Sequence, residues 1–200
     1  TGIINWTSWM SNEASYGYAA AGPMTMVDVS FYNRIDDSDF RKLSWKAPAG
    51  SALEGQNTYC DPEAGAALPD YASLKFRPGQ GNTADYNVGS ACSYPMMRVE
   101  EMYFIEAEAA AQQNPAEGVN LLNSFMQSYR DASYRCLKSS KEDVVEEIVF
   151  QKRVELWGEG QSFFDVKRLN MPVTRGYAGT NHQEIARFNT TTRPAWMNIC

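Results

Sequence analysis

The sequence predicts a mainly α fold of tetratricopeptide-like helical hairpins with long irregular loop insertions, forming part of a larger α fold. The segment 95–170 carries helical periodicity and clear helix-start signals. The segments on either side are rich in turn-forming residues. With 200 residues and 44% hydrophobic content, the chain is long enough and apolar enough to bury a core.

Residues 1–94 are predicted to be a loop-rich insertion region with one helix. Gly, Pro, Asn and Ser recur through "KAPAGSALEGQNTYCDPEAGAALPD" and "FRPGQGNTADYNVGSACSYP", which predict long loops. The one helix is expected near 26–35, followed by the acidic turn "DDSD". Three aspartates in a turn suggest calcium, but this turn lacks the central Gly and closing Glu of an EF-hand loop. We therefore expect a solvated turn and no metal site.

The first predicted hairpin begins after Pro95. The stretch from Met96 to Gln113 has no Gly or Pro and is apolar around almost its whole circumference, which predicts a buried helix. A restart follows, with Asn114 as N-cap and Pro115 at the first helical position. The next helix is amphipathic, and a long helix, a short turn and an amphipathic helix are typical of an antiparallel hairpin. The length of this hairpin is close to that of a tetratricopeptide unit.

A second hairpin is predicted to complete the segment 95–170. Ser139 and Glu142 offer a capping box, and the helix is expected to continue to about Trp157, which should be a core residue. A shorter helix is expected over about 161–169. Residues 171–200 are predicted to be an irregular C-terminal segment, which we expect to be truncated.

Charge and hydropathy exclude two classes of function. Eighteen basic and twenty-four acidic side chains give a net charge of −6, whereas a dedicated nucleic-acid binder needs a basic surface. No apolar run approaches the roughly 20 residues needed to span a bilayer. The chain has no initiator Met, signal peptide or lipid-attachment motif, and both ends are rich in aromatics. We expect it to be an excised piece of a longer protein, so these absences say nothing about location.

Cysteine and histidine usage gives no sign of a metal or cofactor. The spacing of the four cysteines contains no CxxC pair, and His182 is the single histidine. Structural thiols are the favoured interpretation, and whether any two of them form a disulfide stays open. The cysteines are Cys60, Cys92, Cys136 and Cys200.

The stretch "RVELWGEGQSFFDVKRLN", residues 153–170, concentrates glycine, charge and aromatics, and therefore resembles a functional site. As a dinucleotide-binding loop it fails, because Phe163 stands where the third glycine belongs and a helix precedes it instead of a strand. The two glycines are instead expected to mark the corner between two helices.

Two glutamates in this stretch allow two interpretations. Glu155 and Glu159 are spaced i,i+4 and share a helix face if the helix persists through Gly158, so they could form the acid and base of a glycoside hydrolase. Alternatively they are partners in a structural ion-pair network. Arg98 lies on an apolar helix face and needs a carboxylate, and Lys152 shares the face of Glu155. We favour a network of Arg98, Lys152, Glu155 and Glu159.

The sequence resembles the SusD/RagB family of outer-membrane nutrient-binding lipoproteins of Bacteroidetes. The resemblance covers roughly Met26 to Tyr177. It rests on "YPMMRVEEMYFIEAEAAAQ", "AEGVNLLNSFMQSYR" and, most specifically, "IVFQKRVELWGEGQSFFDVKRLN", with support from "FYNRIDDSDFRKLSW" and "SLKFRPG". The sequence departs from the family at Gln151, where many relatives carry an acid. We also expect the family's N-terminal half, with its lipobox and first hairpins, to be missing from this chain.

The resemblance implies a non-catalytic protein on the extracellular face of the outer membrane. Such a protein captures glycan, starch-like or another oligosaccharide, or sometimes peptide, for a SusC-like TonB-dependent transporter. The resemblance implies membrane association only through a lipid anchor, which we expect to be absent from this chain. The resemblance implies no cofactor and no nucleic-acid partner.

Glycan recognition relies on aromatic faces that stack on sugar rings, so aromatics in predicted loops are the candidate ligand-binding residues. The alternative is that these side chains pack the insertion region onto the helices or are covered by the missing half. A function of another class also stays open, namely a helical-repeat scaffold that docks a partner protein or peptide. The candidates are Trp6, Trp9, Tyr16, Tyr18 and Trp45.

Overall fold

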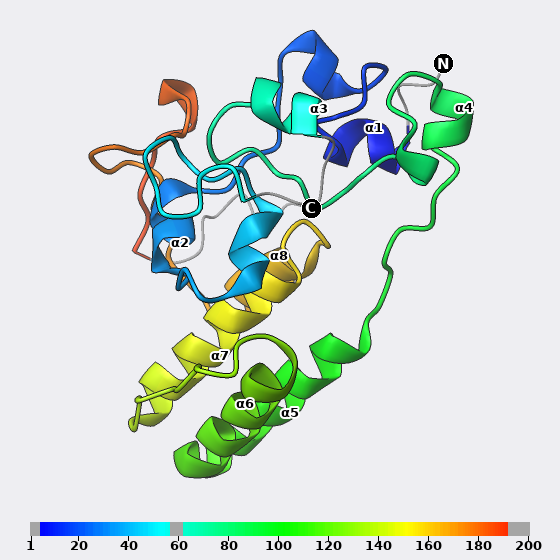
Figure 1. Ribbon diagram of the computed structural model, residues 1–200. Helices are drawn as coiled ribbons and strands as arrows, with labels where there is room; N and C mark the ends of the chain where they lie inside the picture. The colour runs from blue at the N-terminus through cyan, green and yellow to red at the C-terminus, as the bar shows by residue number, and fades with distance from the viewer. Residues whose placement is uncertain (1–4, 57–61, 192–200) are drawn as a thin grey trace. The chain divides into compact units, whose positions relative to one another are not determined.

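The computed structural model describes residues 5–56 and 62–191, and it divides the chain into two compact units, Thr1–Tyr94 and Pro95–Cys200 (Figure 1). Helices dominate the ordered secondary structure of both units. In the described ranges, β pairing is limited to isolated bridges such as Met26 with Ala72 and Thr174 with Asn189. None of the helices in these ranges is long and apolar enough to cross a membrane. The fold is therefore mainly α, as predicted.

The first unit consists of short helices joined by loops. Aspartates cap the N-termini of several of these helices. The Asp28 carboxylate accepts a hydrogen bond from the Phe31 amide, and Asp39 accepts one from the Arg41 amide. The helices are α1 (Trp6–Met10), η1 (Tyr18–Ala21), α2 (Val29–Arg34), η2 (Phe40–Ser44), α3 (Pro62–Ala67), η3 (Gly79–Gly81) and α4 (Tyr86–Gly89). The helix expected near 26–35 is thus α2, shortened at its start by the Asp28 cap.

The aspartates of the turn after α2 have structural roles. Asp36 accepts hydrogen bonds from the backbone and hydroxyl of Ser38, Asp37 pairs with Lys42, and Asp39 pairs with Arg41 at 2.6 Å. Over the described part of the chain, no cluster of His, Cys, Asp and Glu has the arrangement needed to hold a metal ion.

The first unit is organised around a buried tryptophan. Trp45 is fully buried, and the rings of Phe31 and Tyr32 both lie edge-on to it. Backbone pairing fixes its place, because Lys46 donates to the Ala72 carbonyl and Leu74 donates to the Ser44 carbonyl. This pairing connects segments that are far apart in the sequence.

The second unit contains the long helices. α5 and α6 lie side by side as a hairpin, and α7 packs against both (Figure 1). The Asn114 side chain caps α6 as predicted, whereas α7 is capped by Ser140 and not by the expected Ser139. The elements are α5 (Val99–Gln113), α6 (Pro115–Tyr129), α7 (Lys141–Glu155), α8 (Gln161–Arg168) and η4 (Glu184–Ala186).

The core of the second unit lies between α5, α6 and α7. It contains Phe104, Leu122, Met126, Val144 and Ile148, each no more than 1% exposed. The expectation that the first long helix is buried all round is wrong for α5. Its other side carries exposed apolar residues, because its packing partners α6 and α7 cover only one side. These exposed residues include Val99, Met102 and Ile105.

The corner between α7 and α8 contains the two glycines of the "GEG" sequence. Gly158 has φ 76° and Gly160 has φ 87°, backbone conformations that favour glycine. The glycines therefore mark the corner between two helices, as predicted. Trp157 is only half-buried, contrary to expectation, because α7 ends at Glu155 and Leu156 takes the buried position.

The cysteines whose surroundings are described are free thiols. The Cys136 thiol is buried, and burial raises its pKa. The Cys92 sulfur lies 2.9 Å from the Thr7 hydroxyl. Cys60 and Cys200 lie outside the described residues.

Candidate functional site

Two of the predicted ligand-binding residues form a stacked aromatic pair in the first unit. The rings of Trp9, on α1, and Tyr18, on η1, have centroids 3.9 Å apart and planes inclined by 25°. Trp9 is nevertheless 55% exposed, while Tyr18 is partly buried. The pair, which we call the aromatic platform, therefore presents a wide apolar ring surface to solvent.

A close backbone approach positions the two rings. Asn5 caps α1 by accepting a hydrogen bond from the Ser8 amide at 2.9 Å. Gly17, just before η1, lies so close to α1 that a Cβ there would stand 2.8 Å from the Ser8 carbonyl oxygen. Only glycine fits at this distance without displacement, so Gly17 lets η1 bring Tyr18 against Trp9.

The chain that follows α1 is held by a buried amide. The Asn12 side chain donates to the Thr25 carbonyl at 2.8 Å and to the Ser73 carbonyl at 2.9 Å, and it accepts from the Thr25 amide at 3.0 Å. Glu13 next to it pairs with Arg77 at 2.9 Å. The aromatic platform thus lies on a fixed support although it is built from short helices and loops.

Two other candidates pack within the first unit. Trp6 is half-buried between Phe76, whose ring is edge-on at 4.7 Å, and Tyr94, which is stacked at 5.8 Å. The Tyr16 hydroxyl lies over Gly89, where an added Cβ would be only 2.1 Å away, and burial raises the pKa of Tyr16. For these two, the alternative of packing describes the contacts better than ligand stacking.

The prediction that Trp45 binds ligand is wrong. Its side chain is 0% exposed and forms the centre of the first core, so neither ring face is open to a sugar. The turn-rich sequence around it indicated a loop, but backbone pairing with distant residues draws the ring inside.

The predicted ion-pair residues meet in the second unit. Arg98 donates to both oxygens of Glu159, at 2.9 and 3.1 Å, and to the side chain of Glu155 at 3.1 Å. Burial lowers the pKa of Arg98, but its hydrogen bond to Glu159 and the charges of Glu159, Glu155 and Glu100 together raise it. Arg98 therefore stays charged within a network that joins the start of α5 to the end of α7.

Two features of this network differ from the prediction. Arg130, at the end of α6, also donates hydrogen bonds of 2.7 and 2.9 Å to the Glu155 carboxylate. Two buried glutamates beside one arginine were the available signal that a second cation is needed. Lys152 contacts another acid, Asp165 of α8, at 3.2 Å. Arg168 joins Asp165 to Glu108 of α5.

Comparison with known proteins identifies a family. The model of the SusD family matches residues 54–198, more than half of the chain. A search of curated proteins gives no significant match.

Among solved structures, the chain is similar to a SusD-like carbohydrate binding protein from Bacteroides vulgatus ATCC 8482. The two share 31% sequence identity over 76% of this chain, with a TM-score of 0.54. This chain spans 29% of the length of that relative.

Proposed function

The chain belongs to the SusD family, and from this membership we propose that it binds glycan without catalysis as part of a nutrient-uptake system. The similar protein from Bacteroides vulgatus is described as carbohydrate binding, which supports the choice of ligand. The ligand in this proposal is a starch-like or other oligosaccharide. The protein would act on the extracellular face of the outer membrane and deliver the ligand to a SusC-like TonB-dependent transporter.

The observation that carries the proposal is the aromatic platform. An aromatic ring binds a sugar by covering the apolar C–H face of the pyranose, which requires an exposed and well-supported ring. Trp9 meets both conditions, since it is 55% exposed and its other face is stacked on Tyr18. We infer that Trp9 is the main stacking residue and that Tyr18 holds its orientation.

The glutamate pair supports the non-catalytic part of the proposal. A glycoside hydrolase needs one carboxyl group free to protonate the glycosidic oxygen. Both side-chain oxygens of Glu155 and of Glu159 already accept hydrogen bonds from arginine. Both side chains are about 95% buried. These contacts fit a structural role better than acid–base chemistry.

A second candidate function is docking of a partner protein or peptide by the helical hairpins. The exposed apolar side of α5, with Met102 at 44% and Ile105 at 46% exposure, favours it. Retained binding to a transporter together with failure of every glycan would support this candidate over the first.

Glycan binding can be tested by affinity electrophoresis in gels that contain soluble polysaccharides, amylopectin among them. We expect at least one polysaccharide to retard the protein. Trp9→Ala should weaken that binding about tenfold, because the loss of a stacked ring costs about 1–1.5 kcal/mol. Phe164→Ala is the matched control, since Phe164 is 62% exposed but lies in the second unit. Equal retardation of Trp9→Ala and the parent would refute the role of the aromatic platform.

A further inference from the structure

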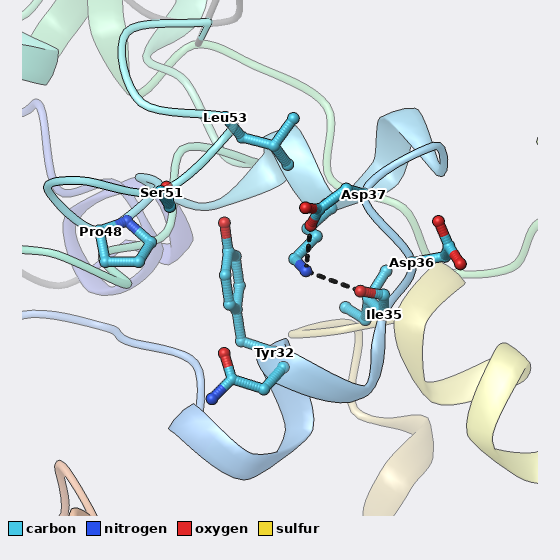
Figure 2. Close-up of a pocket in the computed structure, with 9 residues that line it drawn as sticks. Tyr32, Ile35, Asp36, Asp37, Pro48, Ser51 and Leu53 are labelled. Atoms are coloured by element: carbon cyan, nitrogen blue, oxygen red, sulfur yellow. Dashed lines mark hydrogen bonds and ion pairs between the residues drawn. The ribbon is translucent and has the colours of Figure 1, made fainter.

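A separate polar pocket of about 510 Å³ lies in the first unit, within the size range of small-molecule sites (Figure 2). Its walls come from α2, the acidic turn after it, Lys42 of η2 and the loop 48–53. None of its lining residues belongs to the aromatic platform. The lining residues are Tyr32, Asn33, Ile35, Asp36, Asp37, Lys42, Pro48, Ser51 and Leu53.

Two hydroxyl groups in this pocket are unsatisfied. The side-chain oxygens of Tyr32 and Ser51 are buried and have no hydrogen-bond partner within the described parts of the chain. Tyr32 is only 3% exposed, and Figure 2 shows its phenol pointing toward the loop that carries Ser51 and Leu53. Burial raises the pKa of Tyr32 to about 12, so the phenol keeps its proton at neutral pH and can donate. Buried hydroxyls without partners are unfavourable unless a ligand or ordered water completes them.

The remaining polar groups of the pocket both donate and accept. The Lys42 ammonium donates to the Ile35 carbonyl at 2.7 Å and to Asp37 at 2.6 Å, which uses two of its three N–H groups. The Asp37 side chain is 56% exposed and retains acceptor capacity toward the pocket. Asn33 adds an exposed amide that can do both.

The charge of the pocket selects among ligands. Asp36 and Asp37 contribute two carboxylates against the one ammonium of Lys42, so the formal charge is −1. An anionic ligand would be repelled by the carboxylates, and Lys42 is already paired with Asp37. Pro48 and Leu53 add apolar wall. A neutral ring with hydroxyl groups around its edge matches this mixture of donors, acceptors and apolar surface.

We propose that this pocket is a second binding subsite. It binds a single neutral sugar residue, which forms the missing hydrogen bonds with the hydroxyls of Tyr32 and Ser51. The choice of a sugar among neutral polyols rests on the proposed function, whereas the site itself rests on the two hydroxyls and the lining charges. The subsite acts independently of the aromatic platform.

Ligand-observed NMR of the 200-residue chain tests the proposal with the methyl glycosides of glucose, galactose, mannose and xylose. Methyl glucuronoside serves as the anionic comparison. We expect at least one neutral glycoside to bind and methyl glucuronoside not to bind. The double variant Tyr32→Phe/Ser51→Ala should weaken binding roughly tenfold, as expected for two lost hydrogen bonds. The double variant is also compared with its parent in a Trp9→Ala background, where stacking on the aromatic platform is removed, so a failure of the platform is distinguishable from a failure of the subsite.

Thermal unfolding separates a binding role from a structural one. Because neither hydroxyl has a described partner, the double variant should melt at or above the temperature of the parent protein. Tyr86→Phe is the control, since it removes the same group from an exposed tyrosine of the same unit. The proposal is overturned if no neutral glycoside binds, if the double variant binds as well as the parent, or if it loses melting temperature together with binding.

Discussion

At the scale of single residues, Arg98 shows how far charge alone predicts structure. An arginine on an apolar helix face needs a carboxylate, and the structure supplies Glu155 and Glu159 from about sixty residues further along the chain. The sequence could not indicate Arg130, because its approach to Glu155 depends on where α6 ends relative to α7. The local sequence shows that Arg98 needs a charged partner, but which residue becomes the partner depends on the tertiary structure.

Arg98→Met should destabilise the protein by about 3 kcal/mol, because two buried glutamates lose a partner. Glu155→Gln should also destabilise it, since Arg98 and Arg130 both donate to that side chain. Urea unfolding followed by circular dichroism measures both effects. Arg135→Met, a change at an exposed arginine that donates to backbone carbonyls, is the control and should stay within about 0.5 kcal/mol. Variants of Arg98 and Glu155 as stable as the parent would show that the network contributes nothing.

Tyr32 leads to a prediction about alkaline stability. Burial raises its pKa from 10.0 to about 12, so the folded state keeps the phenol proton at a pH where the unfolded chain has lost it. The contribution of the protonated phenol to the free energy of unfolding is fully present below pH 10. It is lost as the pH rises toward 12, by an amount on the order of 2 kcal/mol. The parent should therefore lose more stability than Tyr32→Phe over this window. Denaturant unfolding of both proteins at the two ends of the window measures the difference, and an equal loss would contradict the burial of the phenol.

At the scale of elements, the α5–α6 hairpin depends on a helix–helix contact that only a small residue allows. A Cβ at Gly118 would lie 2.5 Å from the Ala111 side chain and 3.0 Å from the Ala107 carbonyl. The two helices thus approach at a glycine facing an alanine. The start of α6 was predictable from Asn114 and Pro115, because caps are local signals. The exposed side of α5 was not, because apolar periodicity does not say which neighbours are present to cover it.

Gly118→Ala should destabilise the hairpin although it improves helix propensity. An alanine in a helix is favoured over glycine by about 1 kcal/mol, but overpacking against Ala111 costs about 1–3 kcal/mol. We expect a net loss of about 1 kcal/mol, measured by urea unfolding. Ser124→Ala, at an exposed position of α6, is the control and should be neutral or slightly stabilising. If the Gly118→Ala protein were more stable than the parent, the close contact between α5 and α6 at Gly118 would be contradicted.

At the scale of the whole molecule, the long helices and the candidate ligand-binding residues lie in different units. The second unit holds the long helices and the charged networks, and its helical pattern allowed the fold class to be predicted. The first unit holds the aromatic platform and the polar pocket. The sequence of its loops shows residue types suited to ligand binding, but it does not show how exposed each side chain is. Trp9 and Trp45 therefore looked alike in sequence, although Trp9 is exposed and Trp45 is buried.

A crystal structure of the protein with an oligosaccharide from the polysaccharide that retards it tests glycan binding most directly. We expect a sugar ring stacked on the exposed face of Trp9, with Tyr18 unmoved behind it. An oligosaccharide bound where it touches neither Trp9 nor Tyr18 would contradict the assignment of the aromatic platform as the glycan-binding surface.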